Sequence, residues 1–450
     1  MNIIIALLVF TVIVVLHELG HFLLAKKNGV GVIEFSVGMG PRLITVVKTE
    51  KGMSLKLVPS QKYCEEREDW QNHTLYSWKL LPIGGSCMMV GEDEENDAEN
   101  SFQEANTWGK IAIIAAGPIF NFLSAFVFAI ILIACVGYNS TEVTYVDPNS
   151  SAAEAGIKEG DRITKINGEK MQIGQDVNNY LSLHPTLSED VEMEYITSDG
   201  ENKSVQVSPK YGYYRLGYTY NNTTNGPVEV SEIEDGKPMA EAGVKVGDVI
   251  TQINGTKIAN IEDMSKYLQE TPLTKEDVTI VYERNGQSKE ITITPFYDTR
   301  SDFLMYCYDR QPGNVWQVVK YGVVEIRYWI ETTVKSLGLI VTGKVGTDQI
   351  SGVVGVVDVI GQTVDASPTT KDVLLNLLNI AILLSANLGV MNLLPFPALD
   401  GGRLVFLFVE AVRGKPVNQK IEGTIHLIGI MLLMLLMVAV TYNDILRIVK

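Results

Sequence analysis

The sequence His17-Glu18-Leu19-Gly20-His21 lies near the end of an apolar run that covers residues 3–25. These two histidines and the glutamate are the only ionisable residues in the run. One ionisable side chain near the centre of a bilayer costs about 2.5–3.5 kcal/mol on insertion scales. Three of them in one potential membrane span need a functional reason, and we interpret them as part of a metal site.

Apolar residues are concentrated in four long segments. Of the 450 residues 46% are hydrophobic, and the segments cover residues 3–25, 111–136, 373–394 and 425–440. Each is nearly long enough, or long enough, to cross roughly 30 Å of hydrocarbon. The region between residues 137 and 312 is polar. The sequence therefore predicts a polytopic α-helical membrane protein with four transmembrane helices and one large water-facing insert.

Basic residues indicate how the segments are oriented. Lys26 and Lys27 follow the first apolar segment and do not precede it. By the positive-inside rule, the N-terminus then lies outside the membrane and residue 28 onward lies in the cytoplasm. Counting the spans from there places residues 138–370 and the C-terminus outside. The loop around residues 403–420 faces the cytoplasm.

The polar insert contains an internal repeat. Residues 153–170 and 240–257 are identical at 13 of 18 positions, at an offset of 87 residues. Such self-similarity indicates two copies of one structural unit. Each copy carries Gly-Asp-x-Ile-x-x-Ile-Asn-Gly and resembles PDZ domains, which bind an extended chain end by adding it as a strand to a sheet edge. The alternative is a pair of small β-rich spacers with closed grooves.

The remaining segments complete the expected organisation. Alternating apolar and polar residues in 42–59 and 74–91 predict strands in the cytoplasmic loop. Residues 313–345 suit an amphipathic helix on the outer membrane face, or a core helix packed on the second repeat. The expected order is a first transmembrane helix (1–27), a cytoplasmic membrane-associated β-hairpin loop (28–108), a second transmembrane helix (109–137), two extracytoplasmic PDZ-like α+β domains (138–212 and 213–300), an outer-face linker (301–372), a third transmembrane helix (373–402), a cytoplasmic loop (403–423) and a fourth transmembrane helix (424–450).

His17 and His21 have the spacing of a zinc site on a helix. Residues four apart lie on one helical face, one turn apart, so both imidazoles can reach one Zn²⁺ at about 2.0–2.1 Å. Glu18 lies on the adjacent face, where it can act as the general base toward the attacking water. A solvated helix could carry this pattern by chance, but here the surrounding residues are compatible with lipid. We therefore predict two zinc ligands and a catalytic glutamate.

Asp400 is the expected third zinc ligand. A catalytic zinc usually has three protein ligands and one open position. Pro395 and Pro397 break the third apolar segment just before Asp400, and the predicted topology places this carboxylate at the depth of the histidines. Gly401 and Gly402 permit close approach of the backbone. The alternative is that Asp400 caps the helix that begins at about residue 403.

Residues 17–21 together with residues 392–402 resemble the site-2 protease family of intramembrane zinc metalloproteases, in particular the bacterial RseP type with tandem PDZ domains. Segments 35–41, 81–85 and 116–122 also match, so the resemblance covers essentially the whole chain. It implies cleavage of substrate helices within the bacterial cytoplasmic membrane, with Asp400 completing the zinc site. The resemblance also assigns substrate binding to Asn392, which would hold the unwound substrate backbone, and to Gly38, Gly40, Gly117 and Asn121. The last two could equally serve ordinary helix packing.

Composition limits the possible partners. The net charge is −16, with an acidic run at residues 92–97, which argues against binding of nucleic acid. The four cysteines form no Cys-x-x-Cys pair, so we assign them neither a metal nor a disulfide. The resemblance implies membrane lipids and transmembrane substrates as partners, such as anti-sigma factors or remnant signal peptides, with the PDZ-like pair gating their access. The competing hypotheses are a membrane scaffold with a structural zinc site and a metal transporter.

Overall fold

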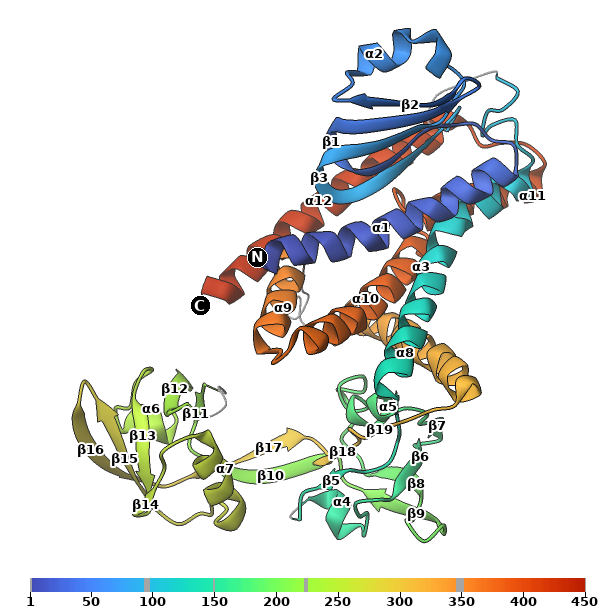
Figure 1. Cartoon of the computed structure of the whole chain (residues 1–450). Helices are drawn as coiled ribbons and strands as arrows, with labels where there is room; N and C mark the ends of the chain where they lie inside the picture. The colour runs from blue at the N-terminus through green and yellow to red at the C-terminus, as the bar shows by residue number, and fades with distance from the viewer. Residues whose placement is uncertain (1, 93–97, 149, 222–225, 345–351, 450) are drawn as a thin grey trace. The chain divides into compact units, whose positions relative to one another are not determined.

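The computed structural model describes residues 2–92, 98–148, 150–221, 226–344 and 352–449 (Figure 1). The chain forms two compact units. The first combines Met1–Ser140 with Asp309–Lys450, and the second is Thr141–Tyr308, so that the second unit is inserted into the first. Residues 93–97, which are most of the acidic run, lie outside the described residues.

Helices make up most of the first unit. They are α1 (Asn2–Lys27), α3 (Thr107–Val136), α8 (Val315–Val341), α9 (Val353–Ala366), α10 (Thr370–Leu393), α11 (Asp400–Arg413) and α12 (Gln419–Val449). In the described part of the chain, α1, α3, α10 and α12 are long and apolar enough to cross a membrane. This confirms the four apolar spans that the sequence predicted, and α12 begins five residues before the expected fourth transmembrane helix of residues 424–450.

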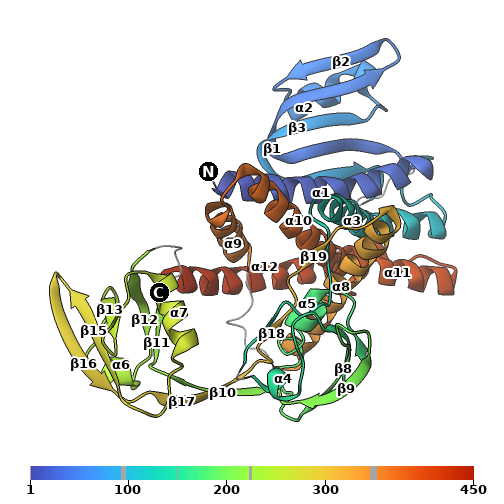
Figure 2. The same cartoon turned by 60° about the horizontal axis from the view of Figure 1, so that its bottom comes forward.

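Small residues bring α1, α3 and α10 close together (Figure 2). A Cβ atom on Gly20 would lie 2.4 Å from the Ala116 carbonyl oxygen, so α1 and α3 touch through their backbones. A Cβ atom on Gly389 of α10 would lie 2.7 Å from the Phe122 ring. The Ser385 hydroxyl of α10 also donates a hydrogen bond to the Asn121 carbonyl oxygen at 2.8 Å. These contacts fix the three helices around one another.

Helix α8 packs on this group of helices. A Cβ atom on its Gly322 would lie 3.2 Å from the Phe126 ring of α3, and the hydroxyl of Thr333 donates a hydrogen bond to Asn387 of α10. The sequence predicted an amphipathic helix here, either on the membrane surface or against the second repeat. In the structure α8 packs on α3 and α10 within the first unit, and its place on the membrane surface stays a prediction.

A three-stranded antiparallel sheet follows α1, in the order β2-β1-β3. Its strands are β1 (Val32–Thr49), β2 (Gly52–Leu57) and β3 (Leu75–Met89). Strand β1 begins ten residues before the predicted segment 42–59, so Gly38 and Gly40 lie inside it. Between β2 and β3, helix α2 (Gln61–Glu66) and the short 3-10 helix η1 (Glu68–Trp70) bury Trp70 in one cluster with Val47.

The second unit is rich in short strands. They are β5 (Tyr145–Val146), β6 (Arg162–Ile166), β7 (Glu169–Lys170), β8 (Val191–Ile196), β9 (Asn202–Val207), β10 (Lys210–Arg215), β11 (Tyr218–Tyr220), β12 (Val228–Ile233), β13 (Val249–Ile253), β14 (Thr256–Lys257), β15 (Val278–Arg284), β16 (Gln287–Ile293), β17 (Phe296–Ser301) and β18 (Met305–Tyr306), with helices α4 (Ser151–Glu154), α5 (Gly174–Asn178), α6 (Pro238–Glu241) and α7 (Ile261–Glu270). A further pair, β4 (Tyr138–Asn139) and β19 (Arg310–Gln311), joins the two chain segments of the first unit.

Each repeat has its own hydrophobic core. Ile166 in the first repeat and Ile253 in the second are buried at equivalent positions. Phe303 and Met305, expected in the linker after the second repeat, instead belong to the core of the first repeat, and β18 pairs with β5. The first repeat is therefore built from chain on both sides of the second.

Candidate metal centre

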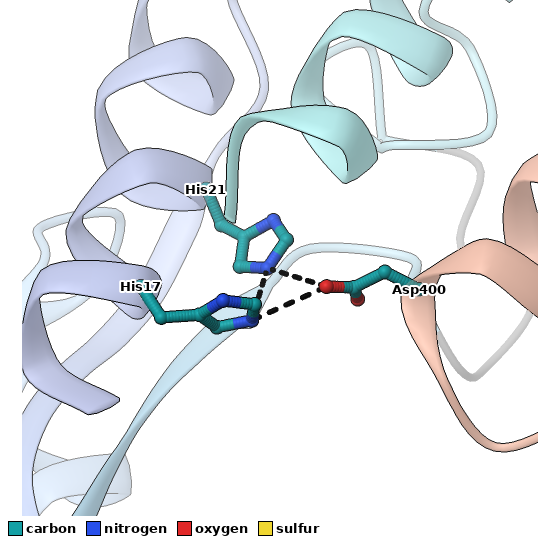
Figure 3. Close-up of side chains that lie close together, drawn as sticks. All are labelled: His17, His21 and Asp400. Atoms are coloured by element: carbon teal, nitrogen blue, oxygen red, sulfur yellow. Dashed lines mark hydrogen bonds and ion pairs between the residues drawn. The ribbon is translucent and has the colours of Figure 1, made fainter. Parts of the chain in front are cut away.

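His17, His21 and Asp400 come together in the first unit (Figure 3). The Nε2 atoms of His17 and His21 lie 3.2 Å apart. The Asp400 Oδ2 atom lies 3.2 Å from Nε2 of His17 and 3.6 Å from Nε2 of His21. Both histidines are buried. The structure thus brings together all three residues that were predicted to bind zinc.

The donor set and its spacing fit Zn²⁺. In a tetrahedral site with bonds of about 2.0–2.1 Å, two ligand atoms lie about 3.3–3.4 Å apart, and the three distances above bracket this value. The Asp400 Oδ2 atom is buried and has no hydrogen-bond partner in the described part of the chain. A buried carboxylate oxygen is costly unless a cation compensates its charge. Two imidazole nitrogens and one such oxygen are ligands that zinc prefers.

Helix α3 contacts His21 at the imidazole nitrogen that faces away from Asp400. The Nδ1 atom lies 2.9 Å from the Ile113 carbonyl oxygen. A carbonyl can only accept a hydrogen bond, so Nδ1 carries the proton and donates it. Nε2 is then unprotonated and available as a ligand, which is the usual arrangement of a metal-binding histidine.

Asn121 of α3 makes the equivalent contact to His17. Its side-chain Nδ2 lies 3.0 Å from the His17 Nδ1 atom, while its buried Oδ1 has no hydrogen-bond partner among the described residues. The oxygen and nitrogen of an amide are assigned from the hydrogen-bond network. Turning the amide by 180° lets Oδ1 accept the His17 Nδ1 proton and leaves Nε2 as a ligand. Asn121 therefore contacts a candidate metal ligand, and its predicted role toward substrate stays a prediction.

Gly117 supplies the space for the two imidazoles. A Cβ atom at this position would lie 2.3 Å from Nε2 of His21 and 2.6 Å from Cε1 of His17. No side chain larger than hydrogen fits there without moving both rings. Gly117 was predicted from the resemblance to bind substrate, and in the structure its backbone forms one wall of the cluster.

Glu18 is held by the sheet beside the cluster. Its Oε2 atom accepts a hydrogen bond from the backbone N–H of Cys87 in β3 at 2.9 Å. Burial, with a smaller contribution from the Glu18 charge, raises the pKa of the Cys87 thiol to about 12. The Cys87 thiol is therefore protonated at neutral pH.

Asp400 is the first residue of α11, and Leu399 occupies the N-cap position without a side-chain cap. The alternative in which Asp400 caps this helix is therefore not observed, and its carboxylate faces the histidines instead (Figure 3). A Cβ atom on Gly401 would lie 2.2 Å from the Leu394 carbonyl oxygen, and one on Gly402 would lie 2.4 Å from that of Phe396. The two glycines thus let α11 start directly against the preceding turn.

The other predicted site residues lie outside the three-residue cluster. Asn392 is next to the last residue of α10, with a half-buried side chain. Gly38 and Gly40 have φ angles of 84° and 88°, which favour glycine inside β1. A Cβ atom on Gly38 would also lie 2.4 Å from the Leu81 carbonyl oxygen of β3. Their roles toward substrate stay predictions.

Sequence reasoning missed three groups that contact the site or its supports. Two belong to the main chain, the carbonyl of Ile113 and the N–H of Cys87, and main-chain groups have no signal in residue type. The third is His426 of α12, whose Nδ1 accepts a hydrogen bond from the Ala398 N–H at 2.8 Å. A histidine within the fourth apolar segment was a signal of the same kind as His17 and His21.

Comparisons with known proteins find relatives along nearly the whole chain. A sequence model of peptidase family M50 matches residues 5–436. Zinc metalloprotease RasP of Geobacillus kaustophilus (strain HTA426) is 30% identical over 458 residues, which cover 98% of this chain and 96% of that protein. The regulator of sigma-W protease RasP of Bacillus subtilis (strain 168) is 29% identical over 465 residues, covering 98% and 97%. Among solved structures, the HtrA3 PDZ domain bound to a phage-derived ligand matches 20% of this chain and 91% of its own, at 15% identity and a TM-score of 0.17.

Proposed function

We propose a role for each residue of this site from one premise, which is that the chain belongs to peptidase family M50 and is a zinc metalloendopeptidase. His17, His21 and Asp400 hold its zinc, and Glu18 is its general base. The observation that carries this assignment is the cluster itself. Three donor atoms with the spacing of a tetrahedral site meet between α1, a helix apolar enough to cross a membrane, and the start of α11. The substrate bond is accordingly cleaved within the membrane.

Glu18 is placed to move the proton in this reaction. When bound, zinc polarises the scissile carbonyl and lowers the pKa of a water molecule. The Cys87 N–H fixes Oε2 of Glu18, so the second carboxylate oxygen is the one that takes the proton of the attacking water and passes it to the leaving amine. The Ile113 carbonyl and Asn121 keep both imidazoles in the tautomer that leaves Nε2 free.

The number of ligands favours catalysis over a structural zinc. Structural sites are closed by four protein ligands, whereas catalytic sites have three and one open position. Among the described residues, three side chains form the cluster. The scaffold alternative needs a fourth side chain at the metal, and the transporter alternative needs no general base beside it.

The proposal also assigns the substrate contacts and the orientation in the membrane. Asn392 and the β1 glycines Gly38 and Gly40 contact the unwound substrate backbone. The active site opens toward the cytoplasm. The termini and the repeats face outward in a bacterial cytoplasmic membrane, as Lys26 and Lys27 after α1 favour. The two PDZ-like repeats gate the access of single-span proteins. The proposed substrate classes are anti-sigma factors and remnant signal peptides. The Bacillus subtilis relative is named a regulator of sigma-W protease, which supports the first.

The test is a Glu18→Gln variant, assayed with a membrane-spanning reporter in proteoliposomes. Loss of the general base should reduce the cleavage rate about 10²–10⁴-fold, while the zinc content of the purified protein stays at one ion per chain. Glu50→Gln, which changes an exposed glutamate in the turn after β1, is the matched control and should cleave at the wild-type rate. Undiminished cleavage by Glu18→Gln would sink the assignment.

A further inference from the structure

Helix α12 touches the ligand-bearing turn at two neighbouring residues. The Nδ1 atom of His426 accepts a hydrogen bond from the backbone N–H of Ala398 at 2.8 Å. One helical turn later, a Cβ atom on Gly429 would lie 2.5 Å from the Pro397 carbonyl oxygen. The absence of a side chain at Gly429 is what allows the backbone of α12 to reach this turn. Residues 397 and 398, which are three and two residues before Asp400, are thus in direct contact with α12.

The backbone hydrogen bonds of the turn show why His426 matters. Pro395 and Pro397 have no N–H to donate. The N–H groups of Leu394, Phe396 and Leu399 donate to carbonyl oxygens of residues 391, 394 and 396, all within the same stretch of chain. The N–H of Ala398 is the one that donates to a different element. Among the backbone N–H groups of this turn, that of Ala398 is therefore the one that links it to α12, through His426.

Ala398 also has a backbone conformation that needs support. Its φ angle is 78°, in the left-handed region, which costs a residue with a side chain about 1–2 kcal/mol. Such conformations persist where the surrounding structure fixes them. An acceptor from α12 aimed at the N–H of this residue is a contact of that kind. Without it, the turn can relax toward ordinary φ values, and Asp400 moves with it.

The rest of α12 suggests that this contact is specific. Between residues 420 and 446, Gly429 and Asp444 are the buried residues of the helix. Gly429 lies against the turn, and Asp444 accepts hydrogen bonds from the backbone N–H groups of Gly352 and Gly355 at the start of α9. The other residues between 420 and 446 are exposed or half-buried, so this helix has its buried residues at two points, and one of them is the ligand-bearing turn.

We propose that His426 is a positioning residue for the metal site, which holds Asp400 in ligating position through the Ala398 N–H. The inference rests on the proposed function, because it requires Asp400 to bind the metal. In this role His426 acts as a hydrogen-bond acceptor, and the accepting atom is Nδ1. A backbone N–H can only donate, so Nδ1 of His426 is unprotonated and the proton of the neutral ring is on Nε2. This nitrogen faces Glu422 Oε1 at 3.9 Å.

Two substitutions separate this role from simple packing. In His426→Asn, the side-chain oxygen occupies the place of Nδ1 and can accept the Ala398 N–H. In His426→Gln, the longer side chain reaches the place of Nε2 and fills more of the ring volume, but it offers no acceptor at Nδ1. A positioning role predicts that Asn replaces histidine better than Gln does, whereas a packing role predicts the opposite order. His426→Ala removes both the acceptor and the volume.

The experiment measures the dissociation constant of Co²⁺ and Zn²⁺ for the detergent-purified full chain, by competition with a chromophoric chelator, and the visible spectrum of the Co²⁺ form. Loss of a group that orients a metal ligand typically weakens metal binding about 10–100-fold. We expect this for His426→Ala and His426→Gln, with a Co²⁺ spectrum altered from the wild type. His426→Asn should bind within about threefold of the wild type and restore its spectrum.

The outcomes distinguish this inference from the proposed function. If the wild-type chain binds no metal, or if Asp400→Ala leaves the dissociation constant unchanged, the metal site itself is wrong. If the wild type binds and all three His426 variants bind equally well, the metal site stands and the positioning role is refuted. The same follows if His426→Asn is as weak as His426→Ala. Asp444→Asn, which loosens the other contact of α12, is the control and should leave the metal spectrum as in the wild type.

Discussion

The helix that carries two zinc ligands and the turn that carries the third are built in different ways. On α1, His17 and His21 are ordinary helical residues whose approach follows from a spacing of four. Asp400 follows a turn with two prolines and a left-handed Ala398, and two glycines crowd against its carbonyl groups. Secondary structure alone orients the first pair of ligands. The third depends on irregular backbone that other parts of the chain must support.

This difference predicts which kind of substitution disturbs each half of the site, the helix with His17 and His21 or the turn with Asp400. Around His17 and His21 there is no spare room, because a Cβ atom on Gly117 of α3 would lie 2.3 Å from the His21 ring and 2.6 Å from the His17 ring. Added volume there should therefore displace the imidazoles themselves. The turn before Asp400 is held by backbone contacts at Gly401 and by the hydrogen bond to His426. Changes of backbone conformation should therefore move Asp400 while the histidines stay in place.

The largest effect is expected for Gly117→Ala. The new methyl group would lie 2.3 Å from the ligand atom of His21 and 2.6 Å from the His17 ring, so both rings must turn away. Overpacking of this kind costs about 1–3 kcal/mol, and we expect zinc to bind about 100-fold more weakly. Titration with a chelator measures this, and cleavage of the reporter should fall in parallel.

Gly338→Ala is the control for this substitution. It also replaces a glycine within a helix, but its Cβ atom would meet no atom within 4 Å. This variant should bind zinc like the wild type. If Gly117→Ala binds zinc with wild-type affinity, α3 does not approach the histidines as closely as described. The claim that the helical half of the site is more sensitive to added volume than the turn would then be wrong.

Much of the helical half of the site could be predicted from the sequence. Ionisable residues in an apolar run and the spacing of His17 and His21 are signals in residue type, and both residues meet Asp400 in the structure. The contacts of the imidazoles could not be predicted in this way. The contact of Asn121 with His17 is one example, because a sequence does not show which atoms of two helices meet.

The position of the turn before Asp400 was predicted from the sequence, but the contacts that stabilise it were not. Two prolines and two glycines mark a break before α11, but the left-handed residue is Ala398, which has no propensity for that conformation. Its partner His426 is 28 residues away on another helix. A similar limit applies in the second unit, where Phe303 completes the core of the first repeat from beyond the second. Contacts of this kind depend on tertiary structure alone.

A smaller effect is expected for Gly401→Ala, which tests the turn. The new Cβ atom would lie 2.2 Å from the Leu394 carbonyl oxygen, so the start of α11 must shift away from the turn and carry Asp400 with it. His17 and His21 remain in place, and we expect zinc binding to weaken about tenfold, or about 1.4 kcal/mol. The control is Gly423→Ala, a helical glycine of α12 with no atom within 4 Å. If Gly401→Ala weakens zinc binding more than Gly117→Ala does, the order of vulnerability proposed for the two halves is wrong.

The smallest effect is expected for Ala398→Gly, and its sign is the informative part. The left-handed conformation of Ala398 costs about 1–2 kcal/mol, which glycine does not incur. Glycine in turn gives the unfolded chain more freedom, which costs about 0.4–1 kcal/mol. The N–H that donates to His426 is retained in this variant. The difference leaves a gain between about zero and 1.6 kcal/mol. At the middle of this range the thermal midpoint in detergent should rise by about 1 °C, with zinc affinity unchanged.

Ala398→Val should act in the opposite direction. A β-branched side chain at a φ angle of 78° is a genuine steric outlier, so the turn must leave this conformation and withdraw its N–H from His426. The midpoint should fall, and zinc should bind more weakly, because Asp400 follows two residues later. A lower midpoint for Ala398→Gly would mean that the left-handed conformation is not under strain. In that case the turn would keep its conformation without help from other elements, as the helix does, and its hydrogen bond to α12 would not be needed to hold Asp400 in place.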